Sequence, residues 1–276
     1  MPLITPSLRK DGVNHNMLVL LNNFRGGLSD NKNRPRYISK PYSAFCSYSS
    51  QLQPEGRLMN SHRTIAVIGG TGYAGSAIAR EAAKRGHAVT VVSRRAADQP
   101  IDGIRHITAT AADAGATVTG AQVVVGALSP RGDNVGTLAQ TYGKLAELAA
   151  GAGARLILVG GFSCLRRTAG GPRILEAEGF PPGTPSELLV EAQENLDVLN
   201  NLLTDSTGVD WLFVSPALEF SAWAPGEDLG HYRIGNDVAL FDDNGKSAIS
   251  GIDYARAVLD EIETPIHHRM QIGIAY

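Results

Sequence analysis

From Thr64 onward, short apolar runs rich in β-branched residues alternate with longer stretches whose apolar residues recur every three or four positions. Runs that are apolar throughout are typical of parallel strands buried on both faces of a sheet. Strands are therefore predicted over residues 64–69, 88–93, 105–110, 122–128, 155–161 and 210–215, with helices over 73–86, 113–120, 134–153 and 184–206. This alternation predicts an α/β fold with a doubly wound, mostly parallel sheet.

The helix near residue 185 has clear start signals. Thr184 and Glu187 have the spacing of a capping box, and Pro185 would occupy the first helical position. An apolar stripe follows at spacings of three and four, which predicts one face docked against the sheet. The stripe consists of Leu189, Ala192, Leu196, Leu199 and Leu203.

The pattern changes after Pro216. Asn244-Gly245 suits a turn that needs positive φ, which predicts a hairpin around it. Ser250 is expected to cap a helix over 251–263, and a closing strand is expected over 269–275. This is too little chain for a second domain, so we expect a small C-terminal cap, a hairpin plus a helix, over the strand ends.

Residues 1–62 differ from the rest of the chain. They are rich in Asn, Ser, Arg and Lys, poor in acids, and show no sustained hydrophobic period. We expect a disordered or dispensable extension, with an organellar transit peptide as the alternative. Met59 lies just before the point where the alternating pattern begins. Residues 63–276 are then expected to form a single domain.

Composition limits the classes of partner. The formal net charge is −2, which gives no support for a nucleic-acid or anionic-membrane partner. The two cysteines, Cys46 and Cys164, form no CxxC pair and suit a reducing compartment, so we expect a cytoplasmic protein. The histidines lack HxxxH spacing, so no metal site is expected. A small-molecule partner and a monomer or homodimer are the remaining expectations.

The stretch Val67–Ala79, VIGGTGYAGSAIA, carries the strongest chemical signal. Gly69, Gly72 and Gly75 recur every third residue, with Thr71 between them, after a strand and at the start of a helix. In such a turn the first glycine permits the tight bend, the second lets the backbone approach a pyrophosphate, and the third lets the helix pack closely. This context predicts a Rossmann-type, dinucleotide-binding domain.

The second predicted strand indicates which dinucleotide. An acidic residue at its end would hold the adenosine ribose hydroxyls, but the chain has Ser93, Arg94 and Arg95 there. Guanidinium groups match a 2′-phosphate in bidentate geometry, so we expect the cofactor to be NADP(H).

The stretch GGTGYAGSAIAREAAKRGHAVTVVSRR resembles the atypical short-chain dehydrogenase/reductases. The similarity is greatest to their NAD(P)H-binding group of NADH-flavin reductase-like proteins, which is related to NmrA-like proteins. It extends over about 64–276 through RLILVGGFSCL, DWLFVSPALEF, GHYRIG and DDNGKSAISGIDYARAVLDEIE.

The resemblance implies a set of cofactor contacts. Thr71, Gly72, Tyr73, Ala74 and Gly75 would line the pyrophosphate, Arg94 and Arg95 would meet the 2′-phosphate, and Asp113 would border the adenine. Ala127, Leu128 and Ser129 would pass beside the nicotinamide-side ribose, Gly160, Gly161, Phe162 and Ser163 would edge the nicotinamide, and Pro216 and Ala217 would close its far side.

The chain departs from its relatives in two ways. The group usually has GGAGSL after the fifth strand, whereas this chain has GGFSCL, so either Ser163 or Cys164 could face the nicotinamide as the candidate catalytic side chain. The Tyr-x-x-x-Lys dyad of tyrosine-dependent relatives, whose phenol passes a proton to the substrate, does not occur.

Three functions are compatible with these residues. The first is an NADPH-dependent reductase of a flavin, a quinone or a similar conjugated acceptor, because such chemistry needs ring stacking more than a protein acid. The second is a non-catalytic NADP(H) sensor of the NmrA-like type. The third, a sugar-nucleotide epimerase or dehydratase, is disfavoured by the missing dyad. Turnover of NADPH with an acceptor separates the first from the second.

Overall fold

The computed structural model describes residues 62–96 and 100–276, so the expectation for the first 62 residues lies outside it except at His62. Within this part of the chain eight strands form one sheet in the order β3-β2-β1-β4-β5-β6-β8-β7. All neighbours pair in parallel except β7 with β8. The strands are β1 (Thr64–Ile68), β2 (Ala88–Ser93), β3 (Ile104–Thr108), β4 (Val123–Gly126), β5 (Arg155–Val159), β6 (Trp211–Pro216), β7 (Arg233–Gly235) and β8 (Met270–Ala275). The predicted doubly wound α/β fold is confirmed.

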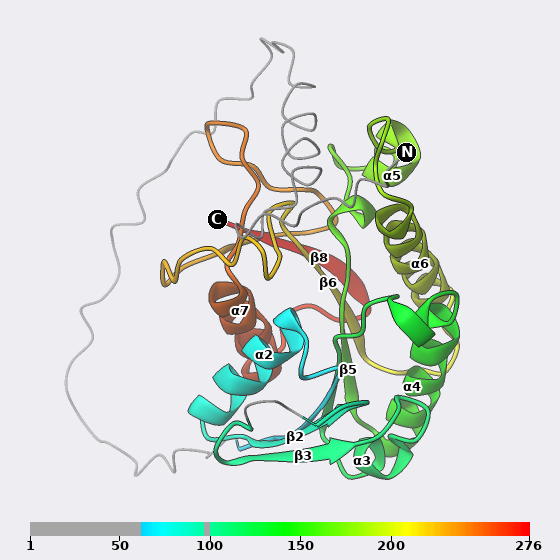
Figure 1. The fold of residues 1–276 in the computed structure, drawn as a ribbon, viewed down its shortest axis with the longest axis vertical. Helices are drawn as coiled ribbons and strands as arrows, with labels where there is room; N and C mark the ends of the chain where they lie inside the picture. The colour runs from blue at the N-terminus through cyan, green and yellow to red at the C-terminus, as the bar shows by residue number, and fades with distance from the viewer. Residues whose placement is uncertain (1–61, 97–99) are drawn as a thin grey trace, which may run out of the picture.

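Helices cover both faces of the sheet (Figure 1). Helices α2 (Tyr73–Lys84) and α7 (Gly251–Glu263) lie side by side on one face, and α3 (Gly115–Thr119), α4 (Leu138–Ala152) and α6 (Ser186–Leu203) lie on the other. The remaining short helices are α5 (Ile174–Glu178) and the 3₁₀ turns η1 (Gly132–Asn134) and η2 (Phe162–Cys164). Each face holds its own apolar layer, because alternate residues of the buried strands point to opposite sides.

Helix α6 begins differently from the prediction. It starts at Ser186 with Pro185 as its N-cap, and no side chain caps it. The Thr184 hydroxyl instead donates to the carbonyl of Pro181 at 2.7 Å, so the capping box is wrong. The Thr184 hydroxyl is engaged in the preceding turn and is not available to cap the helix. Pro185 has no N–H that a side chain could accept from.

The predicted apolar stripe of α6 is only partly buried. Ala192, Leu196 and Leu199 are buried as predicted, but Leu189 and Leu203 are 42% and 55% exposed. Leu202 packs inward in place of Leu203, because a 3.6-residue period turns the buried face around the helix along its length.

The C-terminal region also corrects two expectations. Helix α7 packs beside α2 on the sheet rather than over the strand ends. A turn does form at Asp242–Gly245, where the Gly245 amide donates to the Asp242 carbonyl at 3.0 Å. Beyond the bond from the Asp242 amide to the Lys246 carbonyl at 2.8 Å, its flanks do not pair as a hairpin, because residues 237–239 bond to Arg166 and residues 247–249 bond to Glu219. The Ser250 cap is confirmed: its hydroxyl accepts from the Asp253 amide at 3.0 Å. The closing strand is confirmed as β8.

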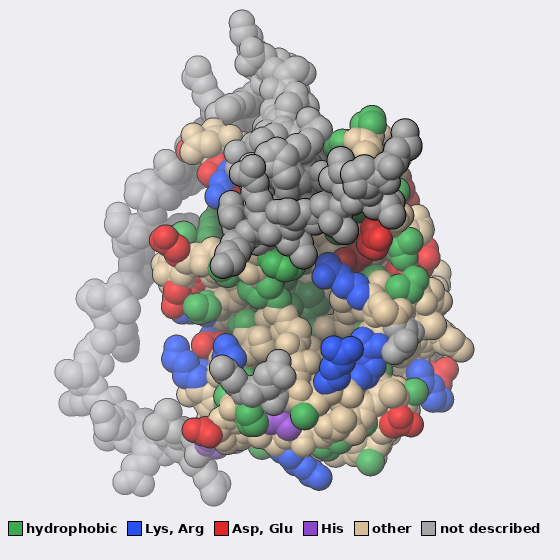
Figure 2. Space-filling model, in the orientation of Figure 1, with side chains coloured by type: hydrophobic (Ala, Val, Ile, Leu, Met, Phe, Trp, Pro, Cys, Tyr) green, Lys and Arg blue, Asp and Glu red, His purple; other side chains and the backbone are tan. Residues whose placement is uncertain are grey.

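Basic and acidic side chains are interspersed over the part of the face in Figure 2 that grey atoms leave visible. Among the described helices, none combines the length and the apolarity that a membrane crossing requires.

Candidate cofactor site

The predicted site residues follow the carboxyl ends of neighbouring strands. In the sheet, β1 lies between β2 and β4, and β5 and β6 come next. The chain leaves β1 toward α2 on one face and leaves β4 toward α4 on the other, so the point between these strands is a topological switch point (Figure 1). Open α/β sheets bind their ligands at that place.

Two of the three glycines are required by the fold itself. Gly69 has φ +88°, and a Cβ there would lie 2.5 Å from the Ala127 carbonyl oxygen. Gly75 lies in the first turn of α2, where a Cβ would lie 2.4 Å from the carbonyl oxygen of Gly69 and 2.9 Å from Cα of Gly70. Any side chain at either position would displace backbone atoms of the loop.

Gly72 is different, because the fold leaves room beside it. A Cβ there would meet only the Gly69 carbonyl oxygen, at 3.4 Å, with φ −75°. Gly72 is also the N-cap of α2, with no side-chain cap and no acidic residue in the first turn. Helix amides without capping acceptors, at the positive end of the helix dipole, form an anion-binding site. The space beside Gly72, at the N-terminus of α2, is called the cradle. A Cβ would fill it, and it therefore fits a pyrophosphate.

The Tyr73 side chain points away from this cradle. Its hydroxyl accepts from the Gly251 amide and donates to the Pro225 carbonyl, both at 2.8 Å. Its ring lies edge-on to Phe220 at 4.9 Å between centroids. The phenol is therefore not available to a ligand in the cradle. What remains there is the backbone of Thr71 and of Tyr73 and Ala74 at the start of α2. The phenol ties the glycine loop to α7, a contact that the sequence did not indicate.

The adenosine side of the site lies at the ends of β2 and β3. Arg94 and Arg95 are exposed, and the Ser93 hydroxyl donates to the Arg95 carbonyl at 2.6 Å. Asp113 lies before α3 and accepts a hydrogen bond from the Thr110 hydroxyl at 2.6 Å. The residues predicted for this side therefore follow the carboxyl ends of two neighbouring strands.

The predicted residues after β4 are Ala127, Leu128 and Ser129, and hydrogen bonds hold their backbone from two sides. The Ala127 amide donates to the Ile68 carbonyl at 2.8 Å, and the Leu128 amide donates to the Tyr142 hydroxyl at 2.8 Å. The Ser129 hydroxyl oxygen is buried and has no hydrogen-bond partner among the described residues. A buried hydroxyl without a partner costs free energy, so its position at the switch point fits a ligand that completes its bonding.

The loop after Ser129 is fixed by a carboxylate from a distant helix. Glu194 of α6 accepts from the amides of Gly136 at 2.6 Å and Leu138 at 3.0 Å. It thereby caps the N-terminus of α4, whose own N-cap Thr137 provides no capping bond, because its hydroxyl donates to the Asn134 carbonyl at 3.0 Å. Sequence reasoning missed Glu194, because nothing local distinguishes it from a solvated glutamate on the face of α6.

Tyr142 supports the strand end from inside the core. It is 2% exposed, and burial raises the pKa of its phenol well above the usual range. Its hydroxyl is engaged by the Leu128 backbone. Tyr142 therefore has a structural role and cannot replace the missing proton donor.

After β5, Gly160 and Gly161 lead into η2. A Cβ on Gly160 would lie 2.1 Å from the Phe213 ring, so only glycine fits under this strand end, whereas one on Gly161 would find ordinary contacts. Phe162 is 9% exposed and lies edge-on to Phe241 at 6.3 Å, within a small apolar cluster. Its ring therefore packs in the protein interior.

The two candidate catalytic side chains have different surroundings. Cys164 is fully buried in the apolar layer beneath α6, and burial raises the pKa of its thiol to about 12. Ser163 is also buried, but it keeps 8% of its surface exposed. Both lie at the end of β5, but the thiol is neutral and enclosed.

A buried polar network supports η2 from below. The Arg173 guanidinium donates to the Cys164 carbonyl and, at 2.7 Å, to Gln271 Oε1. Gln271 in turn donates to the Ser215 hydroxyl at 2.9 Å. This network joins β6, β8 and the loop before α5, and its residues are too far apart in the sequence for a local pattern to reveal it.

Pro216 and Ala217 are buried at the end of β6, next to β5 in the sheet. The Tyr254 hydroxyl donates to the Val214 carbonyl at 2.8 Å and anchors this strand end. Trp223, in the segment that follows β6, is 72% exposed. Within the described ranges no group of His, Cys, Asp and Glu could hold a metal ion.

A family model, a curated relative and solved structures are all similar to this chain over most of the described residues. The model of the NAD(P)H-binding family matches residues 69–265. The uncharacterized protein YwnB of Bacillus subtilis (strain 168) is 32% identical over 207 residues, 74% of this chain and 93% of YwnB. A putative NADH-flavin reductase from Streptococcus pneumoniae TIGR4 is 30% identical, with a TM-score of 0.65 over 77% of this chain and 99% of that one. A putative exported protein from Burkholderia pseudomallei is 33% identical, with a TM-score of 0.66 over 78% and 100%.

The family match begins at the first glycine of the loop and extends through α7, so it includes all the strand ends described above. The glycine loop, the open helix end and the switch point give that match a physical basis. The chain belongs to the NAD(P)H-binding family.

Proposed function

We propose that the protein is an NADPH-dependent reductase of a small conjugated acceptor such as a flavin or a quinone. The observation that carries the proposal is the open cradle at Gly72, with an uncapped helix end behind it and a buried, unpartnered Ser129 hydroxyl across the switch point. The similarity to a putative NADH-flavin reductase over nearly its whole length supports the same class of reaction.

Different residues of the chain bind the adenosine half and the nicotinamide half of such a cofactor. The α2 amides hold the pyrophosphate, and Arg94 and Arg95 hold the 2′-phosphate of the adenosine half. The Ser129 hydroxyl bonds the nicotinamide half. When bound, NADPH supplies a hydride to an acceptor stacked against it.

The acceptor is oriented mainly by Ser163. Its hydroxyl donates a hydrogen bond to a carbonyl oxygen or ring nitrogen, while solvent supplies the proton, because a serine hydroxyl is too weak an acid to do so at neutral pH. Cys164 makes no acceptor contact in this proposal, since its thiol is enclosed in the core.

We predict that the protein prefers NADPH to NADH. Replacing both Arg94 and Arg95 with alanine should weaken NADPH binding by about ten- to a hundredfold, because a hydrogen bond to a charged group contributes about 1.5–3 kcal/mol. NADH affinity should stay unchanged. Calorimetric titration with both cofactors measures this, with Arg80→Ala on the exposed side of α2 as the matched control. Equal affinity of the wild type for the two cofactors would contradict the assignment.

We also predict that NADPH is oxidised when flavins or quinones are added. Ser163→Ala should slow turnover by less than about a hundredfold, because its hydroxyl orients the acceptor without transferring a proton, and only the loss of a proton-transfer group costs that much or more. Cys164→Ala should change turnover less than Ser163→Ala and should lower the melting temperature. NADPH absorbance and a thermal melt of each variant measure these effects. Tight NADPH binding without oxidation by any acceptor would favour the sensor instead.

A further inference from the structure

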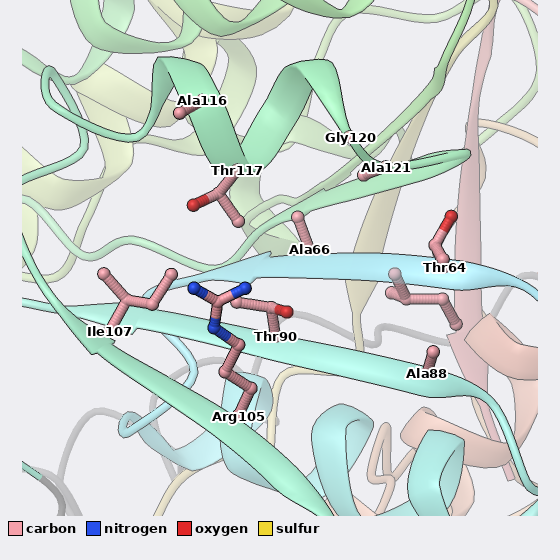
Figure 3. A pocket seen from close by; sticks show the side chains of 11 residues that line it. Thr64, Ala66, Ala88, Thr90, Arg105, Ile107, Ala116, Thr117, Gly120 and Ala121 are labelled. Atoms are coloured by element: carbon pink, nitrogen blue, oxygen red, sulfur yellow. The ribbon is translucent and has the colours of Figure 1, made fainter.

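A pocket lies on the sheet face that carries α3, beside the first residues of β1 and β2 (Figure 3). It has a volume of about 390 Å³, within the usual range for small-molecule sites. Its walls come from β1, β2, β3 and α3, and the lining residues are Thr64, Ile65, Ala66, Ala88, Thr90, Arg105, Ile107, Ala116, Thr117, Gly120 and Ala121.

The pocket exists because small residues meet under a very short helix. Ala66, Ala88, Ala116 and Ala121 stand where larger residues would close the space between sheet and helix. Helix α3 has only five residues, and only Val118 among them is buried. The helix layer therefore leaves the first half of these strands open.

One charged side chain enters this space. In Figure 3 the Arg105 guanidinium points from β3 into the pocket, near Thr90 and Thr117. Thr90 is its direct partner in the register of β2 and β3. The guanidinium and the hydroxyls of these two threonines make no hydrogen bond or ion pair with the described residues, and none of the lining residues is acidic.

We propose that this pocket binds a small organic anion. Its carboxylate or phosphate group binds the Arg105 guanidinium and the hydroxyls of Thr90 and Thr117, since arginine holds such groups by paired, charge-assisted hydrogen bonds. Its flat apolar body lies against Ala66 and Ile107.

The site is separate from the cofactor site. Thr64 and Ala88, which line it, are the first residues of their strands, whereas the glycine loop follows the last residue of β1. At about 3.3 Å per residue, the loop begins about 16 Å beyond Thr64 and about 10 Å beyond Ala66, the lining residue of β1 nearest to it. An anion in this pocket therefore leaves the pyrophosphate cradle free.

The test uses benzoate and phenyl phosphate as probes and benzyl alcohol as their uncharged counterpart. Amide chemical shifts of the ¹⁵N-labelled protein are followed during titration, with and without NADP⁺. We expect shifts at Ala116, Thr117 and Gly120 that persist with NADP⁺ and give a dissociation constant of about 1 mM for the better of the two anions. Tighter binding of benzoate identifies a carboxylate site, and tighter binding of phenyl phosphate identifies a phosphate site.

Arg105→Gln is expected to raise that dissociation constant at least about tenfold, while Arg80→Gln, on the opposite face, leaves it unchanged. Equal binding of benzyl alcohol, no effect of Arg105→Gln, or shifts confined to the glycine loop would each overturn the proposal. None of these readouts depends on whether NADPH is bound or oxidised, so the proposed function is tested separately.

Discussion

Replacing Gly75 with alanine is expected to abolish measurable NADPH binding and to lower the melting temperature. The added methyl would lie 2.4 Å from the Gly69 carbonyl oxygen, so backbone atoms of the loop must move. Overpacking of this kind typically costs about 1–3 kcal/mol. The displaced atoms are those that shape the cradle, so the loss of affinity should exceed a hundredfold.

Gly72→Ala separates the binding role from the structural one. The fold accommodates this methyl, so the melting temperature should stay near that of the wild type. NADPH affinity should nevertheless fall, because the methyl occupies the place where the pyrophosphate approaches the backbone. Gly143→Ala, on the exposed face of α4 with open space around it, is the control and should stabilise the protein by about 0.5–1 kcal/mol. Unchanged affinity in Gly72→Ala would remove the main support for the cradle.

Asp253→Ala is expected to destabilise the C-terminal part of the molecule more than other single changes there. Asp253 is fully buried and accepts hydrogen bonds from the Leu229 amide at 2.9 Å, the Ser250 hydroxyl at 3.1 Å and the Tyr276 hydroxyl at 2.7 Å. It also pairs with Arg256. Removing it leaves several donors unpaired, with a cost of about 3–5 kcal/mol for breaking a buried pair.

A thermal melt measures this loss. At about 2–4 °C per kcal/mol for a domain of this size, the melting temperature should fall by about 6–20 °C. Asp243→Ala, at an exposed position of the turn before Gly245, is the control and should change stability by less than about 0.5 kcal/mol. A comparable loss in both variants would mean that burial and bonding of Asp253 are not the cause.

The sequence predicted those features that short segments determine. The glycine loop, the order of strands and helices and the Ser250 cap depend on neighbours within a few residues, and all three are present. The site residues that the family resemblance predicted all lie at or after the carboxyl ends of strands β1 to β6. Parallel strands deliver their carboxyl ends to one edge of the sheet wherever they stand in the sequence.

The features that were missed depend on contacts between distant segments. Whether Cys164 faces a ligand or the core depends on how α6 packs over η2. The direction of the Tyr73 phenol depends on Gly251, 178 residues away, where only a glycine leaves room for the ring. The predicted hairpin did not form because its two flanks pair with Arg166 and Glu219 and not with each other. Short sequence patterns cannot predict such contacts between distant segments.

The position of β8 has a consequence for the order in which the molecule is completed during synthesis. Strand β8 comes after β7 and α7 in the chain, yet it lies between β6 and β7 in the sheet. While the nascent chain still lacks residues 270–275, β6 has no neighbour on one side and β7 has no partner at all. An unpaired strand edge invites association with other chains. The sheet can therefore close only after β8 has left the ribosome, and until then the edge of β6 is open to a chaperone.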